Sequence, residues 1–140
     1  MADRFAILGQ VLPGDAWIAP DDNEERLYRV PLLDERNAAV KLSEPESVAF
    51  PTQTVVSSIT VCNQDASARD FYVRLRKYVF STGVPDPLND KQFLFYGTSV
   101  GPNRTQILSV ALTLSPGDEI SVGASLADKL SFTAMGIEVT

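Results

Sequence analysis

The chain has 140 residues, of which 44% are hydrophobic and 21% charged, a composition typical of one globular domain and not of a disordered chain. It has no histidine and one cysteine, which excludes Ser-His and Cys-His nucleophile systems, internal disulfides and cysteine-based zinc sites. Its net charge of −6 disfavours nucleic acid as a partner, because that affinity comes mostly from phosphate contacts. No apolar run is long enough for a membrane span, and the first ten residues lack the features of a signal peptide. We therefore expect synthesis in the cytoplasm and no membrane partner.

The sequence predicts an irregular N-terminal arm over residues 1–26, followed by a folded β-sandwich domain over residues 27–140. Pro13, Gly14 and Pro20 prevent one long helix or strand in this segment. The arm is nevertheless too apolar for an idle tail, and we expect it to dock on a neighbouring subunit. Its candidate interaction residues are Phe5, Ile7, Leu8, Trp17 and Ile18.

Most segments after residue 27, apart from residues 34–51, alternate apolar and polar residues with the period of a β-strand, and residues 91–99 are apolar on both faces, as in a central strand. The expected strands cover residues 27–33, 53–63, 70–76, 91–99, 104–114, 119–125 and 129–139. Turn signals separate them at short intervals, so the pattern predicts a single antiparallel β-sandwich of about seven or eight strands, jelly-roll-like or immunoglobulin-like. We expect segments 53–63 and 70–76 to be antiparallel strands joined by a loop, and Gly136 to mark a bulge.

Two alternatives stay open for residues 34–51, which do not follow the strand pattern. The segment fits either a short helical turn capped near Asp34 or a short edge strand.

The alternation also predicts which side chains face the core. Residues that share a face of successive expected strands form this set: Val55, Ile59, Val61, Phe71, Val73, Leu75, Leu108, Val110, Leu112, Ile120, Val122, Leu130 and Phe132.

Tyr72, Arg74 and Arg76 share the opposite face of their strand, which we expect to be exposed. Basic residues beside aromatic ones can bind single-stranded nucleic acid. Tyrosine and arginine are also enriched where proteins meet. The net negative charge favours the second interpretation, so these three residues are candidate protein-contact residues.

Calcium could be held by oxygen ligands in the acidic run at residues 21–25 or in the loop at residues 85–90, but neither has EF-hand spacing. The acidic residues fall in loops or at strand ends, where we expect no burial that would raise a carboxyl pKa for catalysis. Cys62 has no histidine to lower its pKa, which favours a packing role. We therefore expect no enzyme activity, no cofactor and no metal.

Five short motifs occur in a recognisable order along the chain. They are ILGQ at 7–10, LYRVP at 27–31, SSITVCN at 57–63, LSPGDEISV at 114–122 and SFTAMGIEV at 131–139. This order resembles small all-β virion proteins of tailed bacteriophages, particularly cyanophages. Residues 32–50 look like an insertion relative to that pattern. The resemblance implies a structural role and no catalytic residue.

The resemblance implies a virion protein that is assembled in the host cytoplasm. The leading expectation is a capsid decoration or cement protein, a homo-oligomer that contacts the major capsid protein or neighbouring virion subunits. One alternative is a neck, tail or fibre-attachment protein. Another is a host-glycan-binding sandwich that uses exposed tyrosines, with Tyr72, Tyr78 and Tyr96 as candidates.

Overall fold

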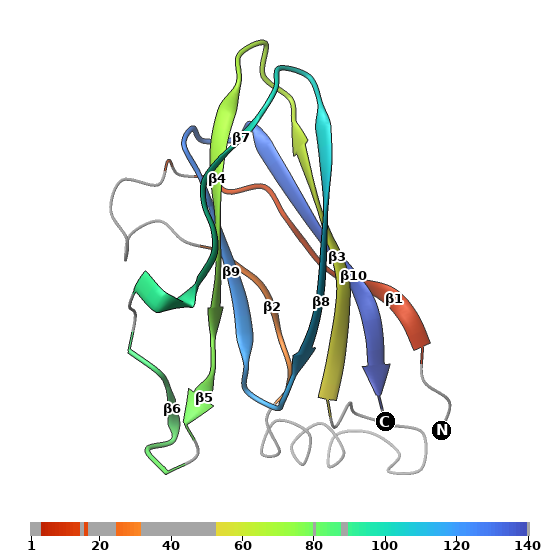
Figure 1. Ribbon diagram of the computed structural model, residues 1–140, viewed down its shortest axis with the longest axis vertical. Helices are drawn as coiled ribbons and strands as arrows, with labels where there is room; N and C mark the ends of the chain where they lie inside the picture. The colour runs from red at the N-terminus through yellow and green to blue at the C-terminus, as the bar shows by residue number, and fades with distance from the viewer. Residues whose placement is uncertain are drawn as a thin grey trace.

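Two antiparallel sheets of four strands each pack face to face in the computed structural model (Figure 1). The structure describes residues 4–14, 16, 25–31, 53–79, 81–87 and 90–139. This arrangement confirms the predicted all-β sandwich. Trp17, Ile18 and the 32–50 segment lie outside the described residues, so the predictions made for them stay predictions.

The first sheet, called sheet A here, has the strand order β1-β10-β3-β8. Its strands are β1 (Arg4–Val11), β10 (Leu130–Val139), β3 (Gln53–Asn63) and β8 (Thr105–Leu114).

The second sheet, called sheet B, has the order β2-β9-β4-β7. Its strands are β2 (Glu25–Arg29), β9 (Glu119–Ala124), β4 (Arg69–Arg76) and β7 (Phe93–Val100). A two-stranded ribbon of β5 (Tyr78–Val79) and β6 (Val84–Pro85), and a 3₁₀ turn η2 (Asp90–Gln92), lie between β4 and β7 in the chain.

The loop between β3 and β4 carries the chain from sheet A to sheet B, so these two strands do not pair with each other. The expectation of two consecutive strands was correct, but the loop is a crossing between the sheets rather than a hairpin turn. Buried Asn63 holds this crossing in place. Its Nδ2 donates to the carbonyl oxygens of Ser67, Val100 and Gly101 at 2.9, 3.1 and 3.1 Å.

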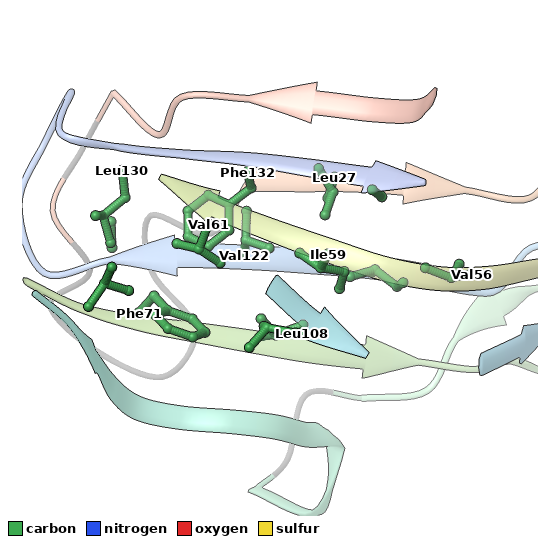
Figure 2. Close-up of a cluster of buried hydrophobic side chains, with 14 of the residues drawn as sticks. Leu27, Val56, Ile59, Val61, Phe71, Leu108, Val122, Leu130 and Phe132 are labelled. Carbon is green, nitrogen blue, oxygen red and sulfur yellow. The ribbon is translucent and has the colours of Figure 1, made fainter. Parts of the chain in front are cut away.

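The hydrophobic core lies between the two sheets (Figure 2). Phe71 from sheet B and Phe132 from sheet A meet edge to face at its centre, with ring centroids 6.1 Å apart. Nine of the predicted core residues are buried: Ile59, Val61, Phe71, Val73, Leu108, Ile120, Val122, Leu130 and Phe132. Leu75, Val110 and Leu112 are partly buried against this cluster.

Val55 is the wrong core prediction, because a bulge in β3 interrupts the alternation. Val56 pairs with Gly136 and Ser58 with Met135, so β3 has one more residue than β10 at this point. The inward residues are therefore Val56 before the bulge and Ile59 after it, whereas Val55 points outward and is half-buried. A Cβ on Gly136 would collide with the Val55 carbonyl oxygen, which explains the glycine at the predicted bulge.

The prediction that residues 4–11 belong to an irregular arm is wrong. They form β1, which pairs along β10 and places Leu8 and Val11 against the core. The expected domain boundary after residue 26 falls inside β2. β1 also passes so close to β2 that a Cβ on Gly9 would collide with the Leu27 carbonyl oxygen. This part of the chain therefore docks on its own sandwich.

Candidate interaction surface

The outer face of sheet A exposes large apolar side chains from three of its four strands. Phe5 and Ile7 on β1 are each 57% exposed, Ile137 on β10 is 36% exposed, and Ile107 on β8 is 68% exposed. Phe5 lies directly opposite Ile137, and Ile7 directly opposite Met135, so these side chains form a continuous patch across β1 and β10.

The same face carries no charged side chain among the described strand residues that point outward. We call it the uncharged face. The strand registers place these residues on it: Phe5, Ile7, Gln10, Val55, Thr60, Cys62, Thr105, Ile107, Ser109, Thr113, Ser131, Thr133, Met135 and Ile137. A fifth of the chain is charged, so this depletion is a property of the face and not of the composition. Depletion of charge together with exposed aromatic and aliphatic groups is typical of the centre of a protein–protein interface.

Two of the predicted arm residues, Phe5 and Ile7, are thus exposed on this face. Leu8 is not, because a bulge in β1 between Ile7 and Gly9 turns it toward the core, against which it packs. It therefore supports the fold rather than offering a contact.

The outer face of sheet B has a different character, with aromatic and charged groups packed together. Tyr96 lies edge to face with Tyr72 at 5.2 Å and with Phe93 at 4.9 Å between ring centroids. The guanidinium carbon of Arg74 lies 4.3 Å from the centre of the Phe93 ring, a cation–π contact. Tyr96 is the exposed member of this group, at 60%.

Arg74 is only 1% exposed, so the expectation that it belongs to an exposed contact face is wrong. Phe95 packs against the core, and strict alternation along β7 would place Phe93 on the same inward face. Irregular pairing between β4 and β7 instead places Phe93 opposite Arg74. Gly97, whose φ of 62° suits glycine, lies in the second irregularity of β7. Phe93 was therefore missed from the sequence, because no glycine or other turn residue marks the irregularity between Phe93 and Phe95.

Arg76, the third predicted contact residue of β4, is partly buried in a structural network. Its Nε and Nη2 donate to the carbonyl oxygen of Asp86 at 3.0 and 2.7 Å. Its Nη1 lies 3.3 Å from Glu119 Oε1, and Glu119 also pairs with Arg26 at 3.1 Å. These contacts use the arginine to tie the β6 segment to sheet B.

Asp118 and Glu119 contradict the expectation that no carboxylate is buried, since they are 2% and 5% exposed. Asp118 accepts from Lys77 Nζ at 2.7 Å and from the backbone N–H groups of Tyr78 and Ser115, both at 2.9 Å. Both carboxylates are matched by cations and donors, as a buried charge requires. This arrangement holds a turn and a ribbon in place.

Among the hollows on the described part of the surface, two lie beside the core. One of about 230 Å³ lies between β7 and β8 and is lined by Leu94, Phe95, Ser109, Val110 and Leu112. The other, of about 300 Å³, is lined by Gln10, Val11, Leu12, Ser131, Phe132 and Thr133. Neither lining contains a titratable side chain, so neither offers an acid, a base or a charged ligand.

No cluster of three or more His, Cys, Asp or Glu residues that could hold a metal ion occurs within the described ranges. Residues 21–24 and 88–89, which belong to the two possible calcium segments, lie outside those ranges. The part of the chain that the structure describes also has no helix long and apolar enough to cross a membrane.

No protein-family model, curated protein or solved structure matches this chain.

Proposed function

We propose that this chain is a structural protein of a bacteriophage virion, a capsid decoration or cement protein that binds capsid or neighbouring virion subunits and is assembled in the host cytoplasm. The observation that carries the proposal is the uncharged face, where Phe5, Ile7 and Ile107 are exposed on an otherwise acidic protein. A surface of this kind supports a role in which the protein works by burying area against other proteins.

The strand order supports a jelly-roll assignment for the sandwich rather than an immunoglobulin-like one. Successive strands alternate between the sheets except at β4 and β7, which are neighbours in sheet B. Eight strands in two four-stranded sheets with this alternation are the pattern of a jelly roll, an architecture used by viral capsid domains. An immunoglobulin fold instead keeps its first two strands in one sheet.

The chemistry of the described residues supports a binding role over catalysis. Asp118 and Glu119, the buried carboxylates, are held by cations and backbone donors, and the hollows beside the core have no titratable lining. The chain has no histidine to act as a general base.

The test is to purify virions and count the copies of this chain per particle by quantitative mass spectrometry. Hundreds of copies are expected for shell decoration. A dozen or fewer would instead assign the chain to the neck, tail or fibre attachment, because those parts of the particle have low copy number. Absence from purified virions would refute the proposal.

A second candidate function, binding of host glycans, is favoured by the aromatic group on sheet B. Tyr72 and Tyr96, two of the three tyrosines considered for this role, lie together with Phe93, whereas Tyr78 lies on β5. Tyr96→Ala should abolish binding on a glycan array if this candidate is correct, and Tyr78→Ala serves as the matched control. An array with no signal for the unmodified protein would eliminate it.

A further inference from the structure

We infer that the uncharged face is the contact between two copies of this chain, which form a symmetric dimer with one sheet A packed on the other. The inference rests on the proposed function in that it specifies one partner of the surface on which the function was argued. Its test uses purified protein, so its outcome is separate from the count of copies in virions.

The distribution of charge is the first argument for a second copy as the occupant. Each chain carries 18 acidic and 12 basic residues, and two copies with a net charge of −6 repel each other over most approaches. When two copies meet through the uncharged face, no charged side chain of the described strands loses its hydration. The outer face of sheet B, by contrast, carries Arg26, Arg76 and Glu119.

The kinds of side chain on the face provide the second argument. A two-fold contact brings the same surface from both partners together, so the surface must complement itself. Hydroxyl groups such as those of Thr60, Ser109 and Thr133 both donate and accept hydrogen bonds, and they can therefore pair with their own kind. Aliphatic groups such as Ile107 and Ile137 are likewise complementary to copies of themselves.

The size of the face provides the third argument. Strands lie about 4.8 Å apart and rise about 3.3 Å per residue, so four strands of eight to eleven residues cover about 600 Å². Two copies would bury about 1,200 Å² in total, which is at the lower end of the range for specific, stable interfaces. Sheets that pack face to face at about 10 Å are also the arrangement by which each sandwich forms its own core.

The experiment measures mass by size-exclusion chromatography with light scattering, over a hundredfold range of protein concentration. The unmodified chain should approach twice its 15.3 kDa at the highest concentration. Ile107→Lys and, separately, Ser109→Lys should give the monomer mass, because each places two lysines in the contact of a two-fold dimer. Both residues are exposed, so these changes leave the core intact, which circular dichroism would verify.

Val84→Lys is the matched control, since Val84 is 54% exposed but lies on β6, away from sheet A. It makes the same change in net charge as Ile107→Lys and should keep the dimer mass. All three variants reduce the net negative charge, so loss of the dimer cannot be attributed to greater repulsion between whole chains.

Cys62 supplies a second readout, because it is the single cysteine of the chain and lies on the uncharged face opposite Ser131. Its rate of reaction with a thiol reagent should fall as the concentration of the unmodified protein rises, and should not change with concentration in Ile107→Lys. A monomer mass for the unmodified chain at every concentration would overturn the inference. If Ile107→Lys were then lost from virions, the occupant of the face would be another virion protein.

Discussion

Truncation of Val56 to alanine should destabilise the protein much more than the same truncation of its neighbour Val55. Val56 is fully buried in the core, whereas the bulge in β3 turns Val55 to the outer face of sheet A. Uninterrupted alternation along the segment predicts the opposite result, with Val55 buried. The pair therefore tests the position of the bulge with one change of chemistry at two adjacent sites.

The size of the effect follows from what each side chain contacts. Val56→Ala removes two methyl groups from water-free surroundings at about 0.8 kcal/mol each and adds the cost of an unfilled cavity, for a total of about 2 kcal/mol. Val55→Ala should cost about 0.5 kcal/mol, as expected for a surface position. For a domain of this length the difference of about 1.5 kcal/mol corresponds to a Tm lower by about 5 °C in Val56→Ala than in Val55→Ala.

The assay is urea unfolding followed by circular dichroism, with thermal melts as a second measure. Both variants should be compared at two protein concentrations, because any part of the free energy that comes from dimerisation changes with concentration. Equal losses of unfolding free energy in the two variants, or a larger loss in Val55→Ala, would show that the assignment of inward residues in β3 is wrong.

Three further predictions concern groups that the fold has placed unexpectedly. Asp118→Ala should lower the free energy of unfolding by about 3 kcal/mol in urea titrations, because it leaves two backbone donors without their acceptor; Lys77→Ala should cost less than Asp118→Ala, because the carboxylate keeps both backbone donors and loses a partner whose side chain is 55% exposed. Deletion of residues 1–11 should abolish the cooperative thermal transition, since it removes β1 from β10; a deletion variant that melts like the parent would show that the sandwich does not need β1. Burial raises the pKa of Tyr28 from 10.0 to about 12, so absorbance at 295 nm should show one tyrosine ionising last. Because the folded protein keeps this proton longer than the unfolded chain, its contribution to stability is complete below pH 10 and is lost between about pH 10 and 12, and Tyr28→Phe should remove that dependence.

Strand positions could be predicted from the sequence because the alternation of side chains across a strand is a local property. The segment expected at residues 53–63 matches β3 at both ends, and most residues expected in the core are buried. β1 escaped prediction for an equally local reason. Phe5 and Ile7 point outward while Leu8 and Val11 point inward, so apolar residues occupy both faces and no clear alternation marks the strand.

Pairing between strands could not be predicted from the same signal, because alternation is identical whether a strand pairs with its chain neighbour or crosses to the other sheet. The loop after Asn63 therefore looks like a hairpin turn in sequence but connects two sheets in the structure. The bulges in β3 and β7 depend on how each strand fits its partners, which is why Val55 was assigned to the wrong face and the outward position of Phe93 was missed.

The sequence by itself determined the β class, most of the strands and the absence of histidine chemistry, because each depends on residue types or on nearest neighbours. Only the tertiary structure decided where the surfaces lie. The uncharged face takes its residues from segments more than one hundred positions apart, such as Phe5 and Ile137, and it exists because the strand order sets those segments side by side. In the same way, alternation along the strand places Arg74 on an exposed face, but the side chain is buried because the ring of Phe93 from β7 lies over it.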